Sequence, residues 1–173
     1  MAQTFTAYFS GIAFATNKAM AGLLNGHATE IIKIRRIGLL NAQTATVTGV
    51  VCQMELRYYP ATSTYSGSTA VTPQAHDSTN SAPTTLTCGH NGTPGGGSPY
   101  VLRRVWWSSD EAALSGSSVD EIEANVPLNI MWDAGYGDSN VQPLTLRQDE
   151  AVVLYNVAGA AGLLDVWVEF TKE

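Results

Sequence analysis

Apolar and polar residues alternate along much of this chain, which is the pattern of a β-strand with one buried face. The longest such stretch runs from Val47 to Tyr59, with Cys52 on its apolar face. The chain closes in the same way, since one face of the predicted final strand carries Leu164, Val166, Val168 and Phe170. A two-residue period of this kind predicts strands rather than helices.

Weaker alternation, or clusters of β-branched and aromatic residues, predicts further strands along the chain. Around residues 32–37 the apolar positions change phase at Arg36–Ile37, which predicts a β-bulge. The run Ala158–Gly162 is predicted to be the turn of a hairpin that joins the last two strands. The additional predicted strands lie at Phe5–Ile12, Met20–Leu24, residues 32–37, Thr69–Thr72, Thr84–Cys88, Tyr100–Trp107, Leu128–Trp132, residues 144–146 and residues 153–157.

One segment departs from the alternating pattern. Ser108 with Glu111, and Ser118 with Glu121, match the spacing of a helix capping box, in which each end of the pair satisfies a backbone N–H. One or two short helical turns are therefore expected near residues 109–124.

The strands and their connections predict the fold class. About eight to ten strands with turns rich in glycine, proline and serine predict an all-β fold, an antiparallel β-sandwich of jelly-roll type. The whole chain, residues 1–173, is expected to form one domain. Within it, about residues 1–17 are expected to form an N-terminal arm laid on a neighbour. About residues 63–99, which are rich in serine, threonine and glycine, are expected to form a polar surface excursion.

Composition narrows the possible partners. Charged residues make up only 14% of the chain, against about 25% in soluble domains, so uncharged polar groups must cover much of the surface. The net charge of −6 argues against a nucleic-acid partner, since phosphate binding needs clustered lysine and arginine. No apolar run approaches the roughly 18 residues of a membrane-spanning helix. The N-terminus lacks a basic stretch and is interpreted as mature chain rather than a signal peptide.

The residues that usually carry chemistry do not form a recognisable site. The glycine-rich stretch from Thr87 to Tyr100 has no lysine and leads into a strand, so it does not match a phosphate loop. His27, His76 and His90 are scattered, and no catalytic motif occurs, so neither a metal, a cofactor nor an enzymatic activity is expected. For Cys52 and Cys88, two free thiols are favoured over a single disulfide.

The aromatic residues offer the best candidates for a contact surface. Trp106 and Trp107 are neighbours on a predicted strand, so one points inward and the other outward. Trp167 falls on the polar face of the last strand, and outward tryptophans are enriched at protein contacts. The alternative is that they pack beneath a second buried layer or a loop folded over the sheet. The candidate protein–protein contact residues are Trp106, Trp107, Trp167, Phe5, Tyr8 and Phe9.

Four segments, in this order, resemble a known class of protein. They read LLNGHATEIIKIRRIGLL, STAVTPQAHDSTNSAP, QPLTLRQDEAVVLYNV and GLLDVWVEFTKE. Together they resemble the jelly-roll capsid decoration, or cement, proteins and related virion structural proteins of tailed bacteriophages. The resemblance implies a non-enzymatic protein on the capsid exterior that forms a homo-oligomer, commonly a trimer. It also implies binding to the major capsid protein or another virion protein, which stabilises the shell.

A second function class stays open at this stage. A β-sandwich of this size also suits a glycan- or receptor-binding module, such as a fibre-tip or lectin-like domain. That interpretation places the binding groove at MWDAGYGDSN, where Trp132 lies among asparagine and aspartate residues.

Overall fold

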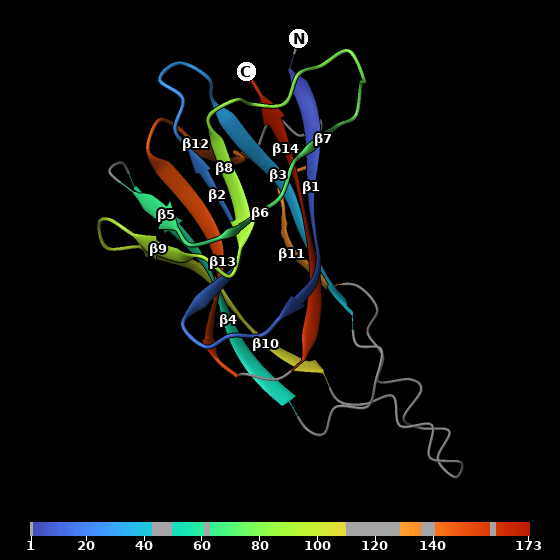
Figure 1. Ribbon diagram of the computed structural model, residues 1–173, viewed down its shortest axis with the longest axis vertical. Helices are drawn as coiled ribbons and strands as arrows, with labels where there is room; N and C mark the ends of the chain where they lie inside the picture. Colours follow the sequence, from blue (N-terminus) through green and yellow to red (C-terminus); the bar gives the residue numbers. More distant parts are fainter. Residues whose placement is uncertain (1, 43–49, 61–62, 110–128, 136–140, 160–161) are drawn as a thin grey trace.

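The protein is a sandwich of two β-sheets. The computed structural model describes residues 2–42, 50–60, 63–109, 129–135, 141–159 and 162–173. These residues form two antiparallel sheets of six strands each, packed face to face, and a separate two-stranded hairpin (Figure 1). The all-β sandwich is thus confirmed. No membrane-spanning helix occurs in this described part of the chain, and the predicted helical turns near 109–124 fall almost wholly outside it.

Each sheet has long strands at its centre and, with one exception, short strands at its edges. Sheet A runs in the order β11 (Asn129–Asp133), β3 (Ile32–Asn41), β14 (Leu163–Lys172), β1 (Gln3–Ala13) and β7 (Gln74–Ala75), and β12 (Leu144–Leu146) also pairs with β3. Sheet B runs β10 (Tyr100–Ser109), β4 (Val50–Tyr59), β13 (Glu150–Ala158), β2 (Lys18–Asn25), β8 (Leu86–His90) and β6 (Thr69–Ala70). The hairpin consists of β5 (Thr64–Ser66) and β9 (Thr93–Gly95). The extra strands beyond the expected eight to ten are mostly two or three residues long, too short to show a period in the sequence.

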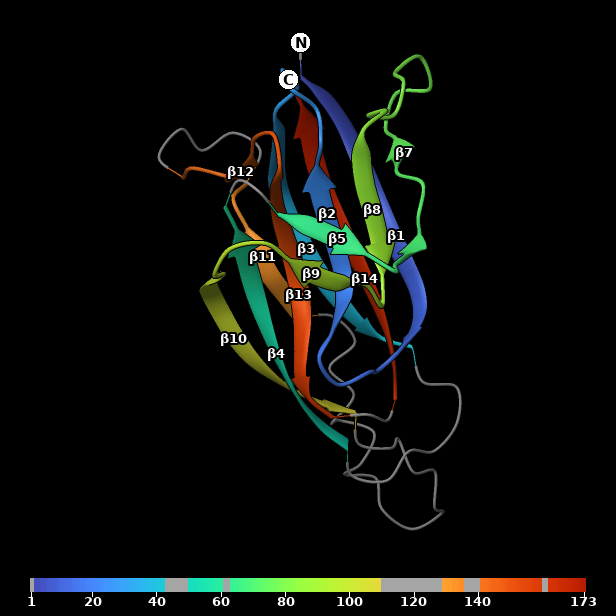
Figure 2. The same ribbon diagram turned by 60° about the vertical axis from the view of Figure 1, so that its left-hand side comes forward.

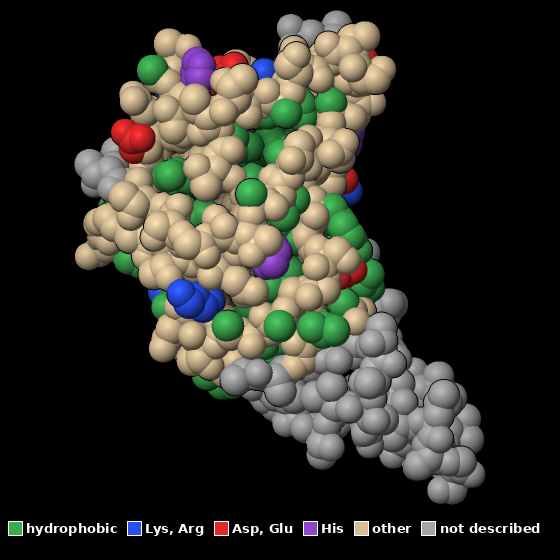
Figure 3. All heavy atoms as spheres, viewed as in Figure 1, with side chains coloured by type: hydrophobic (Ala, Val, Ile, Leu, Met, Phe, Trp, Pro, Cys, Tyr) green, Lys and Arg blue, Asp and Glu red, His purple; other side chains and the backbone are tan. Residues whose placement is uncertain are grey.

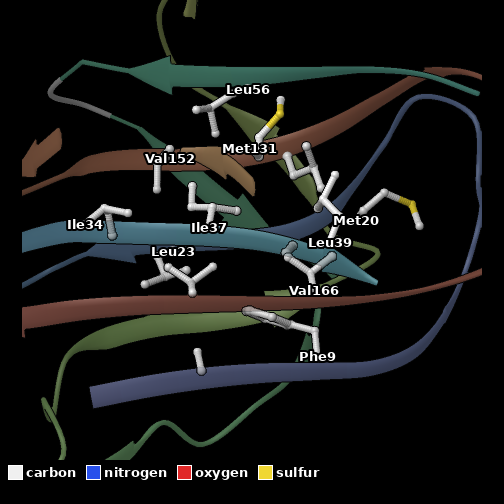
Figure 4. Close-up of a cluster of buried hydrophobic side chains, with 14 of the residues drawn as sticks. Phe9, Met20, Leu23, Ile34, Ile37, Leu39, Leu56, Met131, Val152 and Val166 are labelled. Atoms are coloured by element: carbon white, nitrogen blue, oxygen red, sulfur yellow. The ribbon is translucent and has the colours of Figure 1, made fainter. Parts of the chain in front are cut away.

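The core is the layer of alternate side chains between the two sheets. Leucine, isoleucine, valine, methionine and phenylalanine side chains from both sheets meet there with almost no exposed surface (Figure 4). Each such side chain contributes about 1.5–3 kcal/mol through removal from water. Cys52 and Cys88 belong to this layer as free thiols, as predicted, and burial raises the pKa of both.

The predicted hairpin of the last two strands is wrong. β13 lies in sheet B, between β4 and β2, whereas β14 lies in sheet A, between β3 and β1. The physical reason is that the apolar faces of the two strands oppose each other across the core. Val152 and Leu154 of β13 line the same small interior cavity as Val166 and Val168 of β14. The chain between them therefore crosses from one sheet to the other.

The segment expected to form an N-terminal arm is instead built into sheet A. β1 pairs with β14 along nearly its whole length, from Gln3 opposite Lys172 to Ala13 opposite Leu163. On its other side, β1 pairs with the short strand β7. Its alternate residues are fully buried, so this strand is held by the core rather than by a neighbouring molecule.

The bulge expected near Arg36 is present. Glu169 of β14 lies opposite Arg36, but the next residue, Phe170, lies opposite Ile34, so Arg35 is the extra residue. The bulge lets both Ile34 and Ile37 point into the core despite their odd spacing.

The polar excursion is a structural part of the sandwich. It supplies β8 and β6 to sheet B and β7 to sheet A, and its hairpin of β5 and β9 lies across the outer face of sheet B (Figure 2). Tyr65 anchors the hairpin, because its ring packs with Ala151 and Val153 and its hydroxyl donates to the Gly89 carbonyl at 2.9 Å. Gly92 makes room for this ring, since a Cβ atom there would stand 2.4 Å from it.

Truncation of a core side chain shared by both sheets tests this arrangement. We expect Leu56→Ala to lower the free energy of unfolding by about 2–5 kcal/mol, because it leaves a cavity in a fully buried layer. Val101→Ala, at a position that is 49% exposed, is the control and should change it by less than about 0.5 kcal/mol. Urea denaturation measures both, and equal effects would contradict the described core.

Candidate protein–protein interface

The structure separates the predicted contact residues into buried and exposed groups. Phe5 and Phe9 are fully buried, and Phe5 stacks on Phe170 with ring centroids 5.5 Å apart. They are therefore core residues and not contact residues. Tyr8, between them in sequence, points to the opposite face of β1 and is 48% exposed. The alternation of β1 contains this signal, since Phe5, Ala7 and Phe9 share one face.

Tyr8 and Trp167 belong to a row of side chains across the outer face of sheet A. Tyr8 of β1 lies opposite Trp167 of β14, which lies opposite Gly38 of β3, which in turn lies opposite Ile130 of β11. We call these four residues the outer row. Tyr8 and Ile130 are exposed and Trp167 is half-buried, so the row is an apolar strip on a surface that faces away from the core.

Trp167 packs closely against the sheet because its neighbour is a glycine. A Cβ atom at Gly38 would stand 2.2–2.5 Å from three atoms of the indole ring. Only a residue without a side chain leaves that space free. The indole therefore occupies the space beside the Gly38 backbone, which fixes the ring against the sheet.

A hydrogen-bond network fixes the other aromatic ring of the row. The Tyr8 hydroxyl donates to Asp165 Oδ2, and the Gly11 backbone N–H donates to Asp165 Oδ1 at 2.6 Å. Gly11 has a φ of +60° and follows Phe9 where the register of β1 shifts. The hydrogen bond to Asp165, with burial and the carboxylate charge, raises the pKa of Tyr8. Tyr8 thus stays neutral and held in place.

Beside the outer row, the same face carries ion pairs. Arg36 lies 3.1 Å from Asp133 and 3.9 Å from Glu169, and Lys33 pairs with Glu173. Exposed pairs of this kind contribute at most about 1 kcal/mol each to stability. Their effect here is to divide the face into an apolar part and a charged part.

The second exposed apolar region is strand β10, at the edge of sheet B. Trp106 is 67% exposed there, as the sequence predicted for one of the paired tryptophans. Tyr100, Val101 and Leu102 are exposed too, and the sequence did not single them out because an edge position leaves no mark in the residue pattern. Trp107 pairs with Cys52 through its backbone, and its side chain is outside the described part.

A buried carboxylate ties β10 to the next strand. Glu55 of β4 accepts hydrogen bonds from Arg57 at 2.8 Å and from Arg104 of β10 at 2.9 Å. The Arg57 guanidinium lies 3.7 Å from the centre of the Tyr155 ring. Burial alone would raise the pKa of Glu55, but the hydrogen bonds and charges of the two arginines outweigh it and lower that pKa.

Neither the metal-binding side chains nor the comparisons with known proteins assign a function. No group of three or more histidine, cysteine or acidic residues that could hold a metal ion occurs among the residues that the structure describes. No protein-family model, curated protein or solved structure matches the chain. The two exposed apolar regions, the outer row and β10, are therefore the candidate functional surfaces of the described residues.

A double-mutant cycle tests the packing of the outer row. We expect Gly38→Ala to lower the free energy of unfolding, because the new methyl group displaces the indole ring, and overpacking costs about 1–3 kcal/mol. In a chain that already carries Trp167→Ala, the same glycine substitution should be neutral or stabilising. Urea denaturation of the four chains gives the coupling. Equal effects of Gly38→Ala in both backgrounds would show that the ring does not lie on Gly38.

The acid sensitivity of Glu55 gives a pH test. A carboxyl whose pKa is lowered by folding stabilises the fold above its unfolded pKa of about 4.3, and this contribution disappears as the pH falls through the folded pKa. Glu55→Gln should therefore lower the free energy of unfolding by about 1.5–3 kcal/mol at pH 7, because it weakens two charged hydrogen bonds. It should also flatten the fall of stability below about pH 5. Glu173→Gln, at a more exposed carboxylate that pairs with Lys33, is the matched control and should lower the free energy of unfolding by less than about 1 kcal/mol. An unchanged acid slope in the Glu55 variant would contradict the network.

Proposed function

We propose that this protein is a non-enzymatic structural protein of a bacteriophage virion. In this proposal it is a capsid decoration protein of the jelly-roll type that binds the major capsid protein, or another virion protein, on the outside of the shell. The observation that carries the proposal is the outer row, a fixed apolar strip on the solvent face of a sheet.

The outer row has the properties of a protein-binding surface. Tyrosine and tryptophan are enriched where binding energy concentrates, since they bury a large area with few rotatable bonds. Here both rings are already fixed, Tyr8 by Asp165 and Trp167 by Gly38. Binding a partner therefore costs little side-chain entropy. The strip extends across four neighbouring strands, so it offers a broad contact area, which suits the surface of a shell better than a single inserted side chain.

The rest of the surface fits a protein that works in an assembly. On the face seen in Figure 3, charged side chains are sparse, and uncharged groups and backbone dominate. A surface with little charge gives weak electrostatic repulsion between many copies held close together. This supports a role in a crowded shell.

The competing glycan-binding function is less well supported. Its sequence-based groove needs an available Trp132, but this side chain packs against the hydrophobic core. Residues 136–140 of that segment lie outside the described part of the chain.

Co-sedimentation with capsid shells tests the proposal. Purified protein is mixed with shells of the phage that encodes it, lacking this protein, and the bound fraction is measured after centrifugation. We expect Trp167→Ala and Ile130→Asp each to weaken binding at least about tenfold, the effect of losing about 1.4 kcal/mol at a central contact. Val101→Asp is the control, since Val101 is exposed on β10 of sheet B, and it should bind like the wild type. No binding of the wild-type protein, or binding that these variants leave intact, would overturn the proposal.

Hits on a glycan array that Trp132→Ala abolishes would favour the competing function.

A further inference from the structure

The strands at the edges of the two sheets differ in length. Sheet A ends at β7, of two residues, on one side and at β11 and β12, of five and three residues, on the other. Sheet B ends at β6, also of two residues, and at β10, of ten. Short edge strands limit unwanted pairing, because they leave few free backbone groups. β10 is as long as a central strand.

The outer side of β10 is open within the part of the chain that the structure describes. The strand pairs only with β4 and forms one margin of the sandwich (Figure 2). Residues 100–104 and 106 are all exposed, and Trp106 is the most exposed of the large hydrophobic side chains. A long strand with exposed apolar residues and a free backbone edge is a template for pairing with another strand.

We propose that β10 pairs with β10 of a second copy of this chain, antiparallel and about a two-fold axis through Val105. The way in which two identical strands pair limits the possible registers. In such a pair one residue lies opposite its own copy, and the residues on either side pair crosswise. The choice of the central residue therefore sets every contact.

Charge and backbone geometry select Val105 as the centre. A centre at Arg103 or Arg104 would set two like charges directly opposite each other, which is destabilising. A centre at Leu102 falls where the register between Val101 and Arg103 shifts. With Val105 at the centre, Arg104 of each copy lies opposite Trp106 of the other. With the centre at Trp106, Arg104 would no longer lie opposite Trp106 of the other copy.

The side chains of Arg104 and Trp106 are already oriented for contact across the two-fold axis. Both side chains lie on the same face of sheet B, because Arg104 is opposite Glu55 and Trp106 is opposite Gln53. Glu55 holds Arg104 through its Nε and Nη2 atoms, and the arginine side chain is still 56% exposed. A guanidinium bonded at its edge keeps its flat faces for stacking on an indole ring. Two-fold symmetry makes this contact twice.

Arg103 does not oppose the pairing. Its Nη1 atom donates to the Met131 carbonyl of β11 at 2.6 Å, so its side chain is directed to the other sheet. Residues 103–107 of one copy then pair crosswise with residues 107–103 of the other, and the six-stranded sheet B of each copy joins into one continuous sheet. This gives a dimer, in contrast to the trimer that the family resemblance implies. It uses a surface separate from the outer row, so it does not depend on the proposed function.

Two oppositely charged substitutions of Trp106 test the register. Trp106→Glu places a carboxylate opposite Arg104 of the second copy, whereas Trp106→Arg places a like charge there, and both remove the indole. We expect wild-type protein and Trp106→Glu to be dimers by analytical ultracentrifugation, and Trp106→Arg to dissociate at least about tenfold more readily than Trp106→Glu. A wild-type protein that is monomeric up to about 100 µM, or that is a trimer, would overturn the proposal. Equal dissociation of the two variants would overturn the register.

Cysteine cross-linking locates the axis independently of side-chain energetics. Directly opposed residues have Cα atoms about 4.5–5.5 Å apart, within the range of a disulfide. Val105→Cys should therefore give a covalent dimer under mild oxidation, and Val101→Cys should not. A covalent dimer from Trp106→Cys in place of Val105→Cys would refute the Val105 axis. Native Cys52 and Cys88 are buried and give little background.

The two proposals fail separately. Trp106→Arg protein should still bind capsid shells through the outer row, and Trp167→Ala protein should still be a dimer. Shell binding by a wild-type monomer would refute the dimer alone, while a dimer that ignores shells would refute the capsid function alone.

Discussion

The alternation of side chains on the long strands is the constraint on which the rest of the structure depends. Every long central strand sends one set of side chains into the layer between the sheets, and this layer excludes water almost completely. The opposite set is then fixed in space with the same two-residue period. Tyr8 is presented outside because Phe5 and Phe9 are held inside. The outer row is thus a consequence of core packing.

The sequence predicts the strands better than their partners. Residues 50–59 and 163–172 were found because their alternation is long and unbroken, and the bulge beside Arg36 was found because it shifts the phase. The sheet to which a strand belongs has no such signature. β13 and β14 are consecutive and apolar, and only the opposed faces of Val152 and Val166 across the core show that they lie in different sheets.

The same limit applies to the candidate surfaces. Trp106 and Trp167 were singled out by their residue type and neighbours, and both reach the surface. Gly38 was not, because its role depends on standing opposite Trp167 in a register that the local sequence does not encode. Two glycines of the Thr87–Tyr100 stretch, Gly89 and Gly92, are similar. Both admit other residues at close range, Gly89 next to Ser68 and Gly92 next to Tyr65, so they are packing residues whose role the local sequence does not show.

Side-chain footprinting on the shell-bound protein tests the central claim most directly. Hydroxyl radicals oxidise exposed aromatic side chains, and mass spectrometry reads the extent at each residue, free and bound. If the protein binds capsid shells through sheet A, oxidation of Tyr8 and Trp167 should fall on binding, while the exposed Tyr100 of sheet B should react equally in both states. Bound protein in which Tyr8 and Trp167 react as readily as in free protein would contradict the claim.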